Sequence, residues 1–195
     1  MPDITITFLG TGAGNCIYRA HTAIVVDCAD GTRLLLDSSS GNSVMRQGAA
    51  VGMLASQFNQ VLLTHHHGDH MGGIPFISGQ RRRVDANAAP LRVFSTSEAL
   101  DRLGKVCLAT QLNVPSVDEE GAYFADGSQF LGWTAVDNGK WITLGPNTLA
   151  STFPADHIPG AVGWKIESNG VSVVFSGDTR FSPSVAEASQ GARLL

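Results

Sequence analysis

The chain has 195 residues, 43% of them hydrophobic and 15% charged, and its formal net charge is −4. This length suits one domain, residues 1–195, with a substantial core. The acidic balance argues against a broad nucleic-acid-binding face, which needs excess positive charge, and no apolar run approaches the length that spans a membrane.

The first predicted element is a strand over residues 4–8, in which apolar side chains alternate with threonines and Phe8 belongs to the buried face. The motif Gly10-x-Gly12-x-Gly14 follows. A dinucleotide-binding loop has the pattern Gly-x-Gly-x-x-Gly and opens a helix, whereas the next periodic segment, 23–26, is typical of a strand. We therefore interpret the glycines as a tight turn at the mouth of a functional site.

A hairpin, a helix and another strand come next. Asp30-Gly31 lies between two apolar runs and indicates a hairpin turn. Residues 43–56 predict a helix that Gly48 and Gly52 weaken. The apolar run 60–63 predicts a strand.

The most informative segment is 64–70, with the sequence THHHGDH, which holds four of the six histidines. Imidazole nitrogens and carboxylate oxygens are the usual ligands of zinc and related ions. If the strand continues through the segment, His65 and His67 project to one face and can grip one ion, because side chains alternate along a strand. Asp69 and His70 follow a glycine turn and can serve a second ion. A polar histidine-rich turn is the alternative, which the interleaved aspartate disfavours.

The segment after this motif carries the one basic cluster. Residues 75–83 predict a helix end or loop that includes Arg81-Arg82-Arg83, which we interpret as a solvated loop, with a phosphate clamp as the alternative. Residues 91–94 predict a strand. Residues 97–103 predict a helix whose N-cap is its first residue or Thr96.

The last part of the chain is rich in predicted strands. Residues 113–128 are polar and indicate a surface insertion. Ser182-Pro183 starts a short helix that Gly191 ends, and the last two leucines resemble the first residues of a further buried strand. Strands are expected at 129–136, 141–144, 148–153, 162–167 and 171–175. With no repeat and no linker, these elements predict a layered α/β domain.

Five motifs in order resemble those of the metallo-β-lactamase superfamily, and the opening loop is similar to that of its ribonuclease Z and arylsulfatase-like branch. The resemblance implies a four-layer αββα sandwich. The matching segments are Phe8–Gly14, Leu34–Gly41, the pattern His65-x-His67-x-Asp69-His70, Asp156–Glu167 around His157, and Phe175–Thr179 around Asp178.

The resemblance also implies a binuclear metal centre. One ion would be held by His65, His67 and His157, and the other by Asp69 and His70, with Asp178 bridging both. The expected ions are one or two Zn²⁺, with Mn²⁺ or Fe²⁺ as alternatives. Asp69 would also orient the nucleophile and is the expected catalytic residue. Asp37 is expected to support the site loop, and His21 and His66 to be structural or solvent-facing.

Related proteins continue with a further strand, helices and a final metal-ligating histidine, whereas no histidine follows His157 here. We therefore expect a C-terminally truncated domain that binds one ion tightly and the second weakly or not at all. The competing interpretation is a natural short form whose missing part is supplied by a partner. A homodimer is one such arrangement that the sequence allows.

The implied function is a metal-dependent hydrolase that uses metal-activated hydroxide on a phosphodiester or related ester. One interpretation is a ribonuclease Z-like enzyme that acts on RNA, with tRNA 3′ processing as the most specific case. Against it, this sequence shows no clear arm for gripping tRNA between His70 and His157. An arylsulfatase-like or cyclic-nucleotide phosphodiesterase-like hydrolase of small-molecule esters fits about as well. A noncatalytic metal-binding subunit is the third interpretation. A flavin-linked redox role is disfavoured, because His67 stands where such members carry glutamate.

The three cysteines Cys16, Cys28 and Cys107 show no Cys-x-x-Cys spacing. The odd count favours free thiols in a reducing compartment. No signal peptide is visible after Met1. We expect a cytoplasmic protein without a membrane partner.

Overall fold

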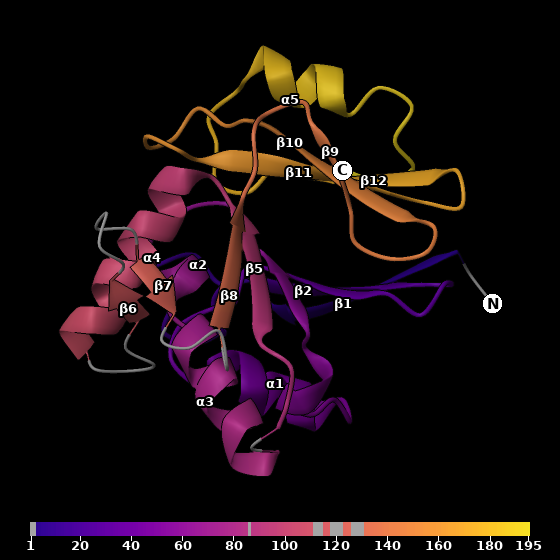
Figure 1. The fold of residues 1–195 in the computed structure, drawn as a ribbon. Helices are drawn as coiled ribbons and strands as arrows, with labels where there is room; N and C mark the ends of the chain where they lie inside the picture. Colours follow the sequence, from indigo (N-terminus) through magenta and orange to yellow (C-terminus); the bar gives the residue numbers. More distant parts are fainter. Residues whose placement is uncertain (1–2, 86, 111–114, 118–122, 126–130) are drawn as a thin grey trace.

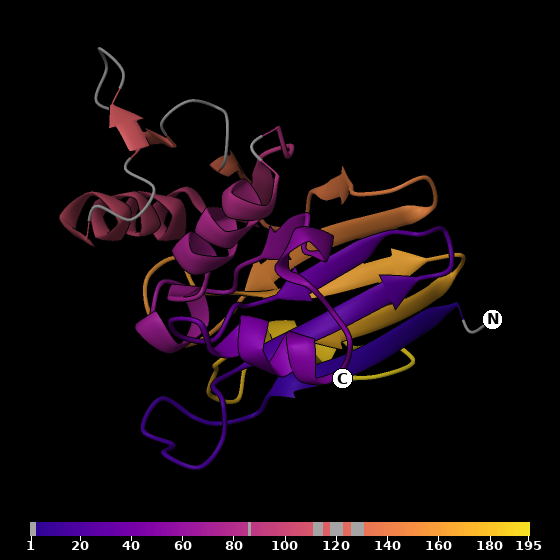
Figure 2. The ribbon, with the colours of Figure 1, turned by 90° about the horizontal axis from the view of Figure 1, so that it is seen from below.

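Two β-sheets pack face to face between two layers of helices (Figure 1). The computed structural model describes residues 3–85, 87–110, 115–117, 123–125 and 131–195. Helices α1 to α4 lie on the outer side of the larger sheet, and α5 covers the outer side of the smaller one (Figures 1 and 2). The αββα sandwich expected from the sequence is therefore confirmed.

The larger sheet has six strands in the order β1-β2-β3-β4-β5-β8. Neighbours from β1 to β3 pair antiparallel, and those from β3 to β8 pair parallel. The carboxyl ends of β3, β4 and β5 therefore meet at one edge, where the loops that follow them come together. The strands are β1 (Ile4–Gly10), β2 (Ala23–Cys28), β3 (Arg33–Leu36), β4 (Gln60–Leu62), β5 (Leu91–Ser95) and β8 (Leu131–Ala135).

The smaller sheet is antiparallel throughout, with the order β12-β11-β10-β9. Its strands are β9 (Trp141–Thr143), β10 (Thr148–Pro154), β11 (Val162–Ser168) and β12 (Val171–Phe175). A separate pair is formed by β6 (Pro115–Val117) and β7 (Tyr123–Ala125). The helices are α1 (Ser43–Ala50), the short 3₁₀ helix η1 (Ala55–Gln57), α2 (Gly68–Met71), α3 (Ile74–Val84), α4 (Ser97–Thr110) and α5 (Pro183–Ala188).

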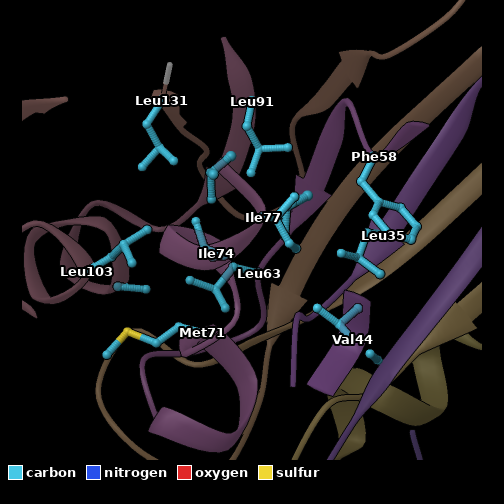
Figure 3. Close-up of a cluster of buried hydrophobic side chains, with 14 of the residues drawn as sticks. Leu35, Val44, Phe58, Leu63, Met71, Ile74, Ile77, Leu91, Leu103 and Leu131 are labelled. Atoms are coloured by element: carbon cyan, nitrogen blue, oxygen red, sulfur yellow. The ribbon is translucent and has the colours of Figure 1, made fainter. Parts of the chain in front are cut away.

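The central strands are buried on both faces, which explains why they read as continuous apolar runs. One face packs against the helices in the cluster drawn in Figure 3, to which the strands contribute Val25, Leu35, Val61 and Val93. The other face packs against the smaller sheet and forms a second hydrophobic cluster with it. The strands of the larger sheet contribute to this cluster Ile24, Val26, Leu34, Leu36, Leu62 and Phe94. The fully buried Trp164 of β11 belongs to this second cluster. The two sheets are thus held in one fixed arrangement.

The basic cluster does not lie in a solvated loop, and that prediction was wrong. Helix α3 runs unbroken from Ile74 to Val84, because Pro75 stands in the first turn, where a missing backbone N–H is not needed. Arg81 is only 4% exposed. A guanidinium buried in the fold is not available as a phosphate clamp.

The Arg81 guanidinium joins three neighbouring segments. It donates hydrogen bonds to the backbone oxygens of Ser56 at 3.0 Å, Phe58 at 2.8 Å and Ala89 at 2.7 Å. A further bond at 2.7 Å goes to the side-chain oxygen of Asn59. Arg81 therefore ties η1 and the start of β4 to the loop before β5.

Other local expectations also need correction. Phe8 is 61% exposed, because a register shift between Phe8 and Gly10 breaks the alternation of β1. The helix expected over 43–56 ends at Ala50. Leu194 pairs with Val173 of β12 through a parallel bridge, which agrees with the expected start of a further strand, but the last two leucines are 48% and 65% exposed and not buried. Of the expected insertion at 113–128, residues 113–114, 118–122 and 126–128 lie outside the described part of the chain.

Within the described part of the chain, no helix combines the length and the apolar character that crossing a bilayer requires.

Replacing Arg81 with alanine should lower the free energy of unfolding by about 3 kcal/mol or more, because several buried oxygens lose their donor at about 1–3 kcal/mol each. Urea unfolding followed by circular dichroism measures the change. The control is Arg83→Ala on the exposed end of the same helix, for which a change within about 0.5 kcal/mol is expected. Equal stabilities of the two variants would contradict this account of Arg81.

Candidate metal centre

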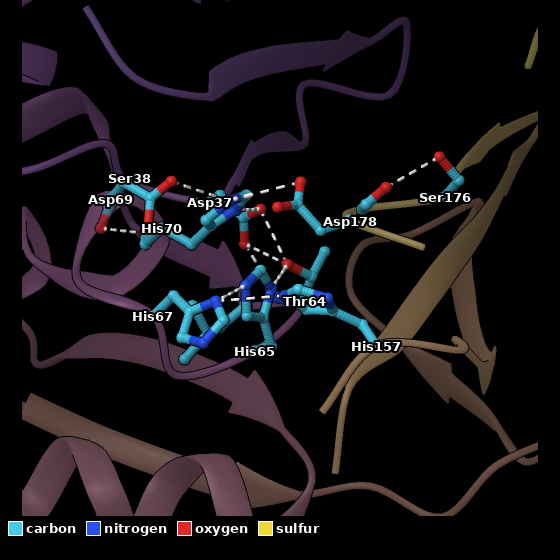
Figure 4. Close-up of polar contacts among 12 residues, drawn as sticks. Asp37, Ser38, Thr64, His65, His67, Asp69, His70, His157, Ser176 and Asp178 are labelled. Atoms are coloured by element: carbon cyan, nitrogen blue, oxygen red, sulfur yellow. Dashed lines mark hydrogen bonds and ion pairs between the residues drawn. The ribbon is translucent and has the colours of Figure 1, made fainter. Parts of the chain in front are cut away.

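Four loops meet at the edge where β3 and β4 end, and each brings a polar side chain to one place (Figure 4). Asp37 directly follows β3, and residues 64–70 follow β4. His157 lies between β10 and β11, and Asp178 follows β12. Both sheets therefore contribute to the same cluster.

Three imidazoles face one another at ligand spacing. His65 Nε2 lies 3.0 Å from His67 Nδ1, and His157 Nε2 lies 3.1 Å from the same atom. A tetrahedral zinc ion with Zn–N bonds of about 2.0–2.1 Å sets its nitrogen ligands about 3.3 Å apart. Both distances from His67 Nδ1 are close to this spacing, and one ligand atom from each of the three residues lies within 4.8 Å of the others, as one small divalent ion requires.

A second group lies beside the first and shares a residue with it. Ligand atoms of His65, His70 and Asp178 all fall within 4.8 Å of one another. His70 Nε2 is 3.4 Å from Asp69 Oδ2 and 3.5 Å from Asp178 Oδ1. One nitrogen facing two carboxylates is an arrangement that a cation between them would stabilise.

The carboxylate of Asp37 is bonded to both groups, directly to His70 and through Thr64 to His65. It is fully buried and accepts hydrogen bonds from the Thr64 backbone N–H at 2.8 Å and from the Thr64 hydroxyl at 2.9 Å. It also accepts a bond of 2.6 Å from His70 Nδ1. The Thr64 hydroxyl lies 2.9 Å from His65 Nδ1. Asp37 thus orients His70 directly and His65 through Thr64.

These partners fix which ring nitrogen carries the proton. Because the Thr64 hydroxyl donates to Asp37, it accepts from His65 Nδ1–H, and His65 Nε2 keeps its lone pair for the cluster. His70 likewise donates from Nδ1 and turns Nε2 toward the two carboxylates. A histidine that donates its other N–H to a carboxylate is the usual supporting arrangement of a metal ligand. The donor set therefore fits a divalent cation.

The electrostatics of the two histidines differ. Burial, together with the neighbouring histidines, lowers the pKa of His65 to about 2, so this ring is neutral, as a metal ligand must be. For His70, burial disfavours the charged form, but the hydrogen bond to Asp37 and the nearby carboxylates raise its pKa above the ordinary value. The second group is thus the more negative, and it attracts positive charge.

The smaller sheet is bonded directly to the loop that carries the histidines. Val162 N–H donates to the Thr64 carbonyl at 3.0 Å, and the Trp164 indole N–H donates to the Leu63 carbonyl at 3.2 Å. Gly177 has a φ of 59°, and a Cβ there would lie 2.9 Å from the Thr64 side chain. Only glycine satisfies both the left-handed backbone and this close approach, so Asp178 reaches the cluster through Gly177.

The glycine motif near the N-terminus does lie at the site. A Cβ on Gly14 would stand 3.0 Å from Asp69 Oδ2, so the loop packs against that carboxylate. His21 Nδ1 is 2.8 Å from the Ser40 hydroxyl, which agrees with a structural role.

The structure brings all six residues proposed as ligands together, but not by the expected route. Strand β4 ends at Leu62, so side-chain alternation does not align His65 with His67. His67 is instead the extended residue that caps α2, the short helix that carries Asp69 and His70. Thr64 was missed as a positioning residue, and its place directly before the histidines was the only signal.

The chain matches the family model described as "Anti-Pycsar protein Apyc1" over residues 4–194. It is 32% identical over 209 residues to ribonuclease Z of Mycobacterium marinum, an alignment that covers 98% of this chain and 69% of that protein. It is 31% identical over 115 residues to ribonuclease Z of Aeropyrum pernix, covering 58% of this chain and 36% of that protein.

Two solved structures are similar in fold. Human tRNase Z, short form, superposes with a TM-score of 0.71 at 19% identity and covers 97% of this chain and 76% of that one. Zn²⁺-bound PqqB from Methylobacterium extorquens also superposes with a TM-score of 0.71, at 16% identity. The superposition covers 97% of this chain and 71% of the PqqB chain. At such identities the likeness concerns the fold.

Replacing Asp37 with asparagine should weaken metal binding by about 10- to 100-fold, because the residues that orient metal ligands have effects of that size. Titration of the metal-free protein with Zn²⁺ by calorimetry measures the change. A stability loss of about 1–3 kcal/mol is expected alongside it, because an amide cannot accept at both of its ends.

The matched control is Asp27→Asn, which removes a partly exposed carboxylate paired with Arg33 at 2.6 Å, outside the cluster. Its metal affinity should equal that of the unaltered protein. If Asp37→Asn bound Zn²⁺ equally well, the assigned role of Asp37 would be wrong.

Proposed function

The chain belongs to the family described as Anti-Pycsar protein Apyc1 and to the ribonuclease Z-like branch of the metallo-β-lactamase superfamily, and from this premise we propose that it hydrolyses phosphodiester bonds at the histidine and aspartate cluster. The observation that carries the proposal is the pair of adjacent donor groups that share His65. Two neighbouring cation sites suit a reaction in which negative charge develops on a phosphoryl group.

His65, His67 and His157 would hold one ion, and Asp69, His70 and Asp178 would hold the other. A divalent ion lowers the pKa of a water that it binds from about 15.7 toward about 7, which supplies hydroxide at neutral pH. Zinc suits the imidazole-rich first group, and the carboxylates of the second also suit manganese or iron.

The protein's own side chains have three tasks in this proposal. Asp37 and Thr64 hold the imidazoles with their lone pairs turned inward. Asp69, packed between the Gly14 loop and His70, accepts a hydrogen bond from the attacking water and so orients it. Asp178, whose side chain is 50% exposed, stands at the open side where a substrate enters.

RNA is the first substrate class, because the relatives at 32% and 31% identity are ribonuclease Z enzymes. Within that class, tRNA 3′ processing is the finer proposal. A small cyclic nucleotide or related ester is the second class, favoured by the net charge of −4 and by the burial of Arg81. A cytoplasmic location and a homodimer stay predictions from the sequence.

Removing metal with a chelator should abolish hydrolysis of bis-p-nitrophenyl phosphate, and Zn²⁺ or Mn²⁺ should restore it. His157→Ala should lower kcat/KM by more than about 100-fold, since loss of a ligand should exceed the 10- to 100-fold effect of losing a supporting residue. His157 is exposed, so the variant should fold normally. Asp156→Asn, the exposed neighbour, is the control and should retain activity. Metal-independent turnover would refute the proposal.

Substrate size is tested with a panel at one metal concentration: a precursor tRNA, a short single-stranded RNA, a cyclic nucleotide and an aryl sulfate. Highest kcat/KM on the precursor tRNA supports tRNA processing. Highest kcat/KM on the cyclic nucleotide supports the small-molecule alternative, and preference for the sulfate ester contradicts phosphodiester chemistry.

A further inference from the structure

A polar cavity of ≈ 370 Å³ lies between the loop that joins β1 to β2 and the start of α1. The loop stands out from the body of the molecule (Figure 2). Arg19 and His21 line the cavity from the loop, and Ser43, Arg46 and Gln47 line it from α1. None of these residues belongs to the cluster described above, and the proposed hydrolysis leaves them without a role.

The charge in this cavity is one-sided. Two arginines line it, and its lining contains no aspartate or glutamate. Within the described part of the chain, neither Arg19 nor Arg46 forms an ion pair. Two uncompensated guanidiniums at one cavity are unusual in a chain with net charge −4. Arginine binds phosphate oxygens through paired N–H donors.

Neutral donors complete the same surface. Ser40 and Ser43 line the cavity, and His21 Nδ1 lies 2.8 Å from the Ser40 hydroxyl. Ser43 is the first residue of α1, and its N-cap, Asn42, makes no side-chain cap. The Ser43 N–H already donates to the Ser40 carbonyl at 3.1 Å, and the helix dipole favours negative charge at this end of α1. These donors point to the same ligand chemistry as the arginines.

The cavity adjoins the metal centre. Gly14, on the same loop, packs against Asp69. A Cβ on Gly72 would lie 3.3 Å from the Ser40 backbone, and Gly72 caps α2, the helix that carries Asp69 and His70. The loop and the Ser40 backbone that border the cavity are therefore in contact with the segments that carry Asp69 and His70.

We propose that this cavity is a phosphate-binding subsite that holds a second phosphate of the substrate, next to the phosphodiester that is cleaved. The inference rests on the proposed function for its substrate and on Arg19, Arg46 and the start of α1 for its chemistry.

Binding is tested first without turnover. Inorganic phosphate is titrated into the metal-free protein at low salt, and the backbone amides and arginine side chains are followed by NMR. Saturable shifts of Ser43, Arg19 and Arg46 are expected. Arg46→Gln should weaken binding about tenfold, and Arg83→Gln, on the exposed end of α3, should not. Absence of saturable shifts, or equal weakening by both variants, overturns the subsite.

Preference is tested second, with a diribonucleotide and its 5′- and 3′-phosphorylated forms. For the unaltered protein, kcat/KM should be about tenfold higher on one phosphorylated form than on the plain dinucleotide. The ratio should fall toward one in Arg46→Gln and persist in Arg83→Gln. A ratio near one in the unaltered protein contradicts the proposal.

The two proposals fail in different ways. Phosphate binding at Ser43 and Arg46 without hydrolysis of any phosphodiester supports the subsite and refutes the proposed function. Metal-dependent hydrolysis without phosphate binding or phosphate preference refutes the subsite alone.

Discussion

The buried carboxylate of Asp37 is the constraint on which the metal centre depends. It lies directly after β3 with a φ of 54°, a left-handed conformation that aspartate adopts more readily than most residues. A buried carboxylate is costly unless it is hydrogen-bonded. Thr64 and His70 supply those bonds. The partners that offset the burial of Asp37 are the same groups that orient the histidines, so folding and site formation are coupled.

The second constraint is the packing of the two sheets. Residues 64–70 follow β4 of the larger sheet, whereas His157 and Asp178 follow strands of the smaller one. The hydrogen bonds from Val162 and Trp164 to the loop before His65 fix how the smaller sheet sits on the larger. Because the apolar core between the sheets is densely packed, this arrangement has little freedom to shift. The packing of the two sheets therefore sets where His157 and Asp178 lie relative to residues 64–70.

Arg81 and the pair Arg19 and Arg46 lie in different surroundings. Arg81, in the only basic run of the sequence, serves the fold by joining three segments. The uncompensated arginines instead line a small cavity next to the centre. Two arginines at one cavity suit phosphate groups at defined positions.

The sequence by itself determined most strands and the candidate cluster at 65–70, because buried strands require apolar runs and metal ligands are restricted in residue type. The αββα fold and the candidate ligands His157 and Asp178 followed from the resemblance of five motifs to the superfamily. The sequence failed at α3, where a proline and three arginines suggested a loop, since the burial of Arg81 depends on backbone oxygens from distant segments. It also failed at β4, because alternation along a strand says nothing about where the strand ends. Only the tertiary structure decided that Asp37 and Thr64 set the histidine orientation, and that Arg19 and Arg46 share one cavity. These are contacts between residues far apart in the chain, which no local pattern records.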